Sequence, residues 1–144
     1  MLTTMLVEDN DHFRRMVRDE ILSRFSLIKV IEASNGEEAF KGLASYSIDL
    51  IFMDIGLEGE NGLKLTQKIK SGYKGKAVGI LSGYDLSEYR EAAVQCGVNF
   101  FIGKDSDSMS DYISKIVECF HGAKDGGRRM PGCLWLLQDE KSFD

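Results

Sequence analysis

The chain has 144 residues and a formal net charge of −5, with 43% hydrophobic residues, 28% charged residues and a single proline. This size and balance are typical of one folded domain, and they exclude collagen, coiled coil and extended disorder. The acidic charge disfavours direct nucleic-acid binding, which draws on clustered lysines and arginines. The apolar stretches are far shorter than the roughly 20 residues that cross a bilayer, so no membrane-spanning segment is expected.

Five apolar runs share the length of a β-strand, and they occupy residues 2–7, 27–31, 48–53, 77–81 and 99–102. Helical spacing separates them, so strand and helix alternate about five times. Strands that are joined through helices run parallel, and such connections are nearly always right-handed. The sequence therefore predicts an α/β fold in which a doubly wound five-stranded parallel sheet lies between two helical layers.

The first helix is predicted over residues 11–24. Its expected buried face holds Phe13, Met16, Val17 and Ile21, and its expected outward face holds Arg14, Arg15, Arg18 and Asp19. The last helix carries the clearest stripe, with apolar residues at helical spacing from Met109 to Phe120. That stripe is expected to face a core.

Two segments carry the signals of helix starts. Ser34 and Glu37 have the spacing of a capping box at the second helix, and Asp85 with Glu88 offers a similar pair at the fourth. The glycine-rich loop 59–62 precedes the third helix.

The helical pattern stops after Gly122 and is followed by glycine, proline and charged residues. We therefore expect a domain over residues 1–122 and a C-terminal tail or linker over 123–144, with no output domain.

Three cysteines, Cys96, Cys119 and Cys133, are an odd number and lack the short spacing of metal ligands. They predict neither a disulfide framework nor a zinc site. A reducing compartment suits such thiols, so a cytoplasmic location is expected.

Polar side chains directly follow four of the apolar runs. They are Glu8 and Asp9 after the first, Asp54 after the third, Ser82 after the fourth and Lys104 after the fifth. The carboxyl ends of parallel strands meet at one edge of a sheet, where ligands of such folds bind. Three carboxylates at one edge repel each other, and a hard cation such as Mg²⁺ relieves that repulsion. Charge alone therefore indicates a metal site.

These residues resemble the receiver domain of two-component response regulators. The family motif has an acidic pair after strand 1, an aspartate after strand 3, a serine or threonine after strand 4 and a lysine after strand 5, and each position is filled here. The loop from Asp54 to Gly62 also looks like that of the family, including the glycine eight residues on. The resemblance covers about residues 3–121 and implies a CheY-like, flavodoxin-like sheet of strand order 2-1-3-4-5.

The resemblance implies that Asp54 accepts a phosphoryl group from a phosphohistidine of a sensor histidine kinase or a histidine phosphotransfer protein. It further implies that Mg²⁺, with Mn²⁺ as a substitute, is held by Glu8, Asp9, Asp54 and the backbone carbonyl of Gly56. Lys104 and the hydroxyl of Ser82 would bind phosphoryl oxygens. Such a domain is not an enzyme in the ordinary sense, because it catalyses only its own phosphorylation and slow self-dephosphorylation.

Ser82 and the aromatic residue three before the lysine, Phe101, would form the switch, with Phe101 moving from an exposed to a buried position. The expected output surface comprises the fourth helix, the fifth strand and the fifth helix. This surface would bind a downstream protein, pass the phosphoryl group on in a relay, or form a phosphorylation-dependent homodimer. The alternative is a receiver-like binding module that works without phosphorylation.

Overall fold

The computed structural model describes residues 1–57, 59, 61–83, 86–104 and 109–126. Three sequence predictions fall outside the described residues. They are the part of the expected tail beyond residue 126, Cys133, and the helix cap at Asp85.

Within the described residues, the strands form one parallel sheet with the order β2-β1-β3-β4-β5, which confirms the predicted fold and strand order. The strands are β1 (Thr3–Val7), β2 (Lys29–Ala33), β3 (Leu50–Asp54), β4 (Ala77–Ser82) and β5 (Phe100–Gly103). The central strands β1, β3 and β4 are nearly continuous runs of buried residues, as expected for a sheet covered on both faces.

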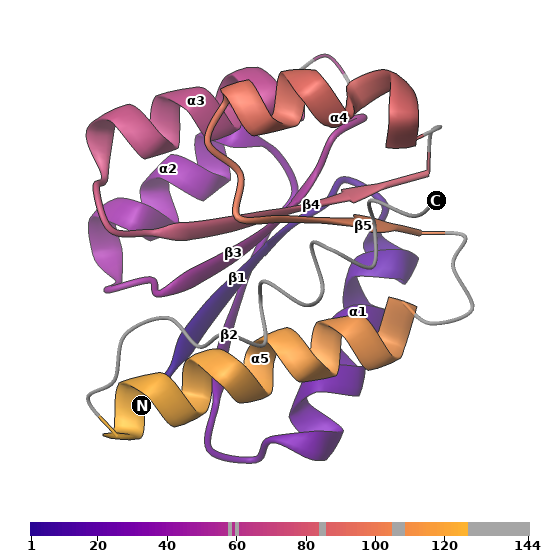
Figure 1. The fold of residues 1–144 in the computed structure, drawn as a ribbon. Coiled ribbons are helices and arrows are strands. Elements are labelled where there is room, and N and C mark those ends of the chain that lie inside the picture. The colour runs from indigo at the N-terminus through magenta and orange to yellow at the C-terminus, as the bar shows by residue number, and fades with distance from the viewer. Residues whose placement is uncertain (58, 60, 84–85, 105–108, 127–144) are drawn as a thin grey trace.

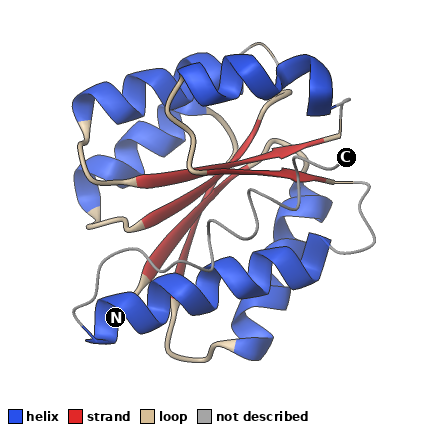
Figure 2. Ribbon diagram, viewed as in Figure 1, coloured by secondary structure: helices blue, strands red, loops and turns tan. Residues whose placement is uncertain are grey.

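Helices cover both faces of the sheet, so the domain has three layers (Figures 1 and 2). The helices are α1 (Asp11–Arg24), α2 (Gly36–Ser45), α3 (Gly62–Gly72), α4 (Leu86–Gln95) and α5 (Met109–Gly126). Figure 1 shows α1 and α5 on one face and α2, α3 and α4 on the other. The arrowheads of β4 and β5 point to the right of that view, which places the carboxyl ends of these strands there.

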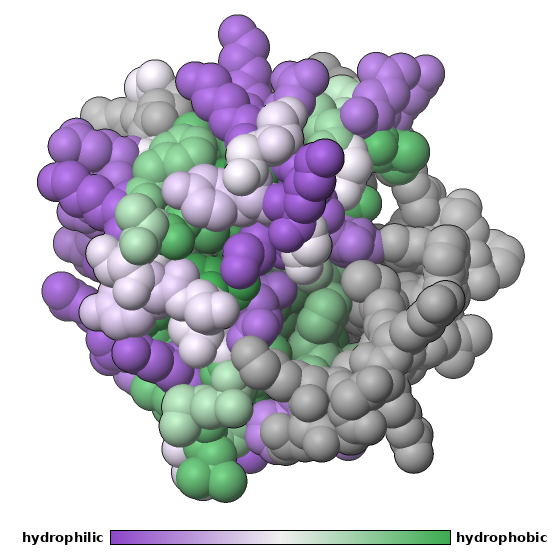
Figure 3. Space-filling view, turned by 90° about the vertical axis from the view of Figure 1, so that its left-hand side faces the viewer, coloured by the Kyte–Doolittle hydropathy of each residue, from purple (hydrophilic) through white to green (hydrophobic). Residues whose placement is uncertain are grey.

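Each face of the sheet has its own hydrophobic core. One cluster joins α1 and α5 to the sheet through Val17, Ile21, Ile113, Ile116 and Val117, which confirms the predicted stripe of the last helix. The other joins α2 and α3 to the opposite face through residues such as Ala39, Leu43, Leu63, Leu65 and Ile69. Figure 3 shows the surface that forms the left-hand side of Figure 1. On this surface, hydrophilic side chains surround and interrupt the hydrophobic ones.

Two element boundaries differ from the sequence prediction. β2 begins at Lys29, two residues later than expected, because pairing with β1 sets its register from Thr3 and Lys29 onward. Leu27, expected in the strand, is 70% exposed. α5 continues to Gly126, beyond the expected boundary at residue 122.

The bounds of α1 agree with the prediction, but two of its side chains were assigned to the wrong face. Arg14 was expected outward and is buried, whereas Met16 was expected inward and is 44% exposed. Arg14, Val17 and Ile21 have the spacing i, i+3, i+7, which places them on one helix face. The sequence pattern indicated an outward position for residue 14 because it is charged. An arginine is buried only when its guanidinium has partners, and these are not visible in the sequence.

The start of α2 also corrects the sequence analysis. Asn35, not Ser34, is the N-cap, and its side chain accepts a hydrogen bond of 2.9 Å from the backbone N–H of Glu38. Glu38, not Glu37, reaches back, and it accepts from the backbone N–H and the hydroxyl of Ser34. The expected box is therefore displaced by one residue.

Cys96 is a free thiol. Cys119 is disulfide-bonded, so the expectation of no disulfide is wrong for Cys119. None of the described helices combines the length and hydropathy that a membrane span requires.

A close contact between β4 and β5 yields a test of the packing. Gly79 pairs with Phe100, and a Cβ at residue 79 would lie 1.5 Å from the Phe100 ring, which is buried against Phe52. We expect Gly79→Ala to lower the free energy of unfolding by about 1–3 kcal/mol, because the ring has no free space to enter. Urea denaturation measures this change.

Gly72→Ala is the matched control, since a Cβ there meets no atom within 4 Å at the end of α3. It is expected to leave stability unchanged or slightly raised. Equal stability of Gly79→Ala and wild type would contradict the packing described.

Candidate functional site

The register of the central strands brings the first two acidic residues together. Val7 of β1 pairs with Met53 of β3, so the residues that follow, Glu8 and Asp54, lie side by side at the carboxyl edge of the sheet. Their side chains are only 4% and 6% exposed. Two carboxylates are thus held together where little water reaches them.

Asp9 completes an acidic cluster. One carboxylate oxygen from each of Glu8, Asp9 and Asp54 lies within 4.8 Å of the other two. Oxygens on opposite sides of a bound Mg²⁺ are about 4.2 Å apart, since each Mg–O bond is about 2.1 Å. These three side chains therefore fit a hard divalent cation after a small closure, and the attraction of the cation, which relieves the repulsion between the carboxylates, favours that closure.

Lys104, directly after β5, provides the positive charge within this cluster. Its ammonium group contacts Oε1 of Glu8 and lies 3.2 Å from Oδ1 of Asp54. Its backbone N–H donates to the carbonyl of Ser82 over 2.7 Å, which ties the ends of β4 and β5 together. The structure thus pairs Lys104 with the acids to which a cation would bind.

Burial and charge shift two pKa values at the site. Burial raises the pKa of Glu8 to about 7, and its contact with Asp54 adds to this, while Lys104 and the backbone N–H of Asn10 oppose it. Burial lowers the pKa of Lys104, but its contacts with Glu8 and Asp54 outweigh that effect and raise it overall. Glu8 therefore exchanges its proton near neutral pH, whereas Lys104 stays charged.

The loop after β3 orients Asp54. The backbone N–H of Gly56 donates to Oδ1 of Asp54 over 3.1 Å. Gly62 lies so close that a Cβ would be 2.2 Å from the carbonyl oxygen of Asp54, so glycine is required there. The N–H of Gly62 also donates to the carbonyl of Ile55. The glycine eight residues after Asp54 thus allows α3 to begin directly against the site.

Ser82 and Phe101 lie on the neighbouring strands. Ser82 ends β4 and is buried, opposite Gly103 of β5. Phe101 is buried in the core shared with α2 and α3, and its strand neighbour is Ile80. The structure therefore shows Phe101 in the inward position, and its role as a switch stays a prediction.

Sequence reasoning missed two side chains of α1 that touch the site. The ring of Phe13 lies 4.7 Å from the ammonium nitrogen of Lys104, and a nitrogen of Arg14 donates to the carbonyl of Glu8 over 2.7 Å. The sequence placed Phe13 on the inner face of the helix but gave no sign of Lys104 as its neighbour. For Arg14, its spacing with Val17 and Ile21 was the available signal.

The fold and this edge define a class of signalling domain. The family described as response regulator receiver domain matches residues 4–117, and the chain belongs to that family, which serves two-component signalling. Receiver domains generally bind Mg²⁺, and they interact with sensor kinases and downstream partners.

Individual relatives agree with this assignment. The chain is 29% identical to the chemotaxis protein CheY of Halobacterium salinarum over 115 residues, covering 78% of this chain and 94% of that protein. A cyclic di-GMP phosphodiesterase of Thermotoga maritima is 32% identical over 103 residues, which are 72% of this chain but only 27% of that protein. The response regulator TrrA of Thermotoga maritima, solved in complex with Mg²⁺ and BeF, superposes with a TM-score of 0.72 at 25% identity, covering 83% of this chain and 99% of that one.

The raised pKa of Glu8 predicts an unusual pH dependence of stability. A carboxyl with a pKa of about 7 when folded and 4.5 when unfolded binds its proton more tightly in the folded state. The Glu8 contribution to the free energy of unfolding of the metal-free protein therefore rises as the pH falls from about 8 to 5, on the order of 2 kcal/mol. Urea denaturation in a chelator across this pH range measures it.

Glu8→Gln cannot titrate at this position and isolates the effect. The difference in stability between the variant and wild type should shrink steadily as the pH falls. Parallel pH profiles for the two proteins would show that Glu8 titrates normally.

Proposed function

We propose that Asp54 accepts a phosphoryl group from a phosphohistidine of a sensor histidine kinase or histidine phosphotransfer protein, with the help of Mg²⁺. The observation that carries this proposal is the meeting of Glu8, Asp9, Asp54 and Lys104 at one sheet edge in a chain of the receiver family. A carboxylate oxygen of Asp54 forms the new bond to phosphorus as the phosphorus–nitrogen bond of the donor breaks. The electron pair of that bond returns to the imidazole of the donor.

The surrounding residues hold the charge of the transferred group. The ion is proposed to have four ligands on this chain, with Glu8 acting directly or through water: the side chains of Glu8, Asp9 and Asp54 and the backbone carbonyl of Gly56. When bound, Mg²⁺ or Mn²⁺ supplies Lewis-acid stabilisation of the phosphoryl oxygens, and the TrrA structure supports this choice of ion. Lys104 pairs with one phosphoryl oxygen and Ser82 donates its hydroxyl to another.

Phosphorylation adds nearly two negative charges beside Ser82 and Lys104, and this draws both residues towards Asp54. Both stand at the ends of strands, so the chain that follows each of them moves as well. Phe101 already lies inward in this structure, and this movement is proposed to favour that position further. The resulting change appears on the surface of α4, β5 and α5, which we propose as the binding site for a downstream protein, for a relay partner or for a second phosphorylated copy.

The domain acts as a phosphoacceptor and catalyses only its own phosphorylation and slow self-dephosphorylation. We propose that the receiver domain extends from residue 1 to the end of α5 at Gly126, four residues beyond the expected boundary at 122, and that the residues after it form the tail or linker. We propose a cytoplasmic location, in the same compartment as the proposed phosphohistidine donor. The disulfide at Cys119 removes the argument from reduced cysteines, so the location rests on the donor alone.

The test is intact mass spectrometry after incubation with a small phosphodonor, with and without Mg²⁺. Wild type should gain one phosphoryl group only when Mg²⁺ is present, and Asp54→Asn should gain none, because its amide cannot form the acyl phosphate.

Asp19→Asn changes an exposed aspartate of α1 and is the matched control, which should be phosphorylated like wild type. An adduct that persists in Asp54→Asn would place the acceptor elsewhere. A folded, Mg²⁺-binding wild type that gains no adduct from the small donor or from phosphorylated kinases would favour a binding module that works without phosphorylation.

A further inference from the structure

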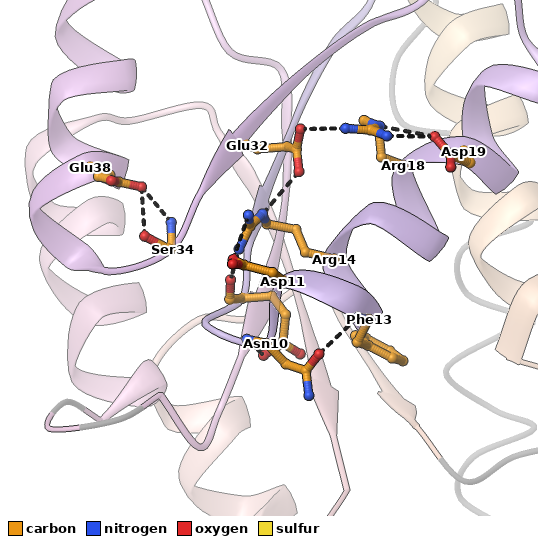
Figure 4. Close-up of polar contacts among 10 residues, drawn as sticks. Asn10, Asp11, Phe13, Arg14, Arg18, Asp19, Glu32, Ser34 and Glu38 are labelled. Atoms are coloured by element: carbon orange, nitrogen blue, oxygen red, sulfur yellow. Dashed lines mark hydrogen bonds and ion pairs between the residues drawn. The ribbon is translucent and has the colours of Figure 1, made fainter.

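Arg14 lies beneath the acidic edge of the sheet and connects three elements. Its three guanidinium nitrogens have three different partners, namely the carbonyl of Glu8 at 2.7 Å, the carboxylate of Glu32 at 2.9 Å and the carboxylate of Asp11 at 2.8 Å. Its side chain is only 10% exposed. Figure 4 shows Arg14 extending from α1 between Glu32 of β2 and Asp11. A planar, five-donor fork fixed on three sides has little freedom to move.

The contact with Glu8 falls on the peptide that links the two acids of the site. A peptide group is planar, so fixing the carbonyl of Glu8 also fixes the N–H of Asp9 and the direction in which the chain leaves β1. The N–H of Glu8 donates to the carbonyl of Ala33, which fixes the other side of this residue. Arg14 thus determines how the acidic pair is presented.

Arg18 provides an internal comparison one helical turn away. It binds the other oxygen of Glu32 at 2.9 Å and pairs with Asp19, so its ion pairs resemble those of Arg14 (Figure 4). Its described partners are Glu32 and Asp19, neither of which belongs to the acidic cluster, and its side chain is 31% exposed. The two arginines therefore differ mainly in the contact with the acidic pair.

We propose that Arg14 is a positioning residue that holds Glu8 and Asp9 in the geometry that binds the divalent cation; this inference rests on the proposed function. Charge and geometry act in opposite directions here. The positive charge of Arg14 repels a cation nearby, whereas its hydrogen bond to the Glu8 carbonyl prearranges the ligands. The proposal holds that positioning outweighs repulsion. A substitution that keeps the positive charge at residue 14 but loses the three-way hydrogen bonding of the guanidinium should therefore weaken cation binding.

Arg14→Lys is that variant, because an ammonium group cannot reach three separate partners. We expect it to weaken Mg²⁺ binding about tenfold, as loss of a residue that orients metal ligands commonly does. Arg18→Lys should remain within about twofold of wild type. Isothermal titration calorimetry with MgCl₂ and no phosphodonor measures both, and the NMR line width of the Asp9 amide should increase in Arg14→Lys alone.

Equal Mg²⁺ affinity of folded Arg14→Lys and wild type would overturn the proposal, as would an equal loss in Arg18→Lys. Should Arg14→Lys not fold, Asp11→Asn and Asp19→Asn decide the matter, since each of these exposed carboxylates pairs with one of the two arginines. At high salt, which screens their charges, Asp11→Asn is expected to bind Mg²⁺ about twofold or more weakly than Asp19→Asn. Equal binding overturns the proposal.

The two proposals fail in different ways. A wild type that binds Mg²⁺ but takes no phosphoryl group would contradict the proposed function, while the comparison of the arginine variants would still be read from Mg²⁺ binding alone.

Discussion

Mutual repulsion among three carboxylates at one edge of the sheet is the constraint around which this site is built. Glu8, Asp9 and Asp54 place an oxygen each within 4.8 Å of the others, and two of these side chains are nearly inaccessible to water. The parallel register of β1 and β3 enforces this closeness, because it is fixed by buried residues that cannot shift by one position without reversing their faces. The fold therefore imposes a concentration of negative charge that Lys104, protonation of Glu8 or a bound divalent cation relieves.

Lys104 relieves part of that repulsion in the metal-free protein. Its ammonium group satisfies Glu8 and approaches Asp54, and its backbone is tied to Ser82. A divalent cation bound to the same carboxylates would compete with this ion pair and leave the lysine available for an anion. Because Lys104 directly follows β5, whose neighbours include α4 and α5, the charge balance of the site is mechanically linked to the proposed output surface.

The sequence predicted the sheet and the meeting of its polar strand ends because both depend on simple regularities. Apolar runs give strands, intervening helices make them parallel, and parallel strands end together. Arg14 was misplaced because its burial depends on Glu32, Asp11 and the Glu8 carbonyl, which only the folded chain brings within reach. The start of β2 and the cap at Asn35 were displaced for a related reason, since pairing with β1 and local hydrogen bonds select among neighbouring residues of similar character. The pairing of Lys104 with Glu8 likewise depends on side-chain geometry between the ends of β1 and β5, which the sequence alone does not give.

The central claim is that Lys104 and a divalent cation compete for the same carboxylates. Isothermal titration of MgCl₂ into Lys104→Met tests it directly, with Lys68→Met, an exposed position of α3, as the control. Methionine retains the length and most of the apolar volume of the lysine while removing its charge. The account predicts tighter Mg²⁺ binding in Lys104→Met and unchanged binding in Lys68→Met. Unchanged or weaker binding in a folded Lys104→Met protein would contradict it.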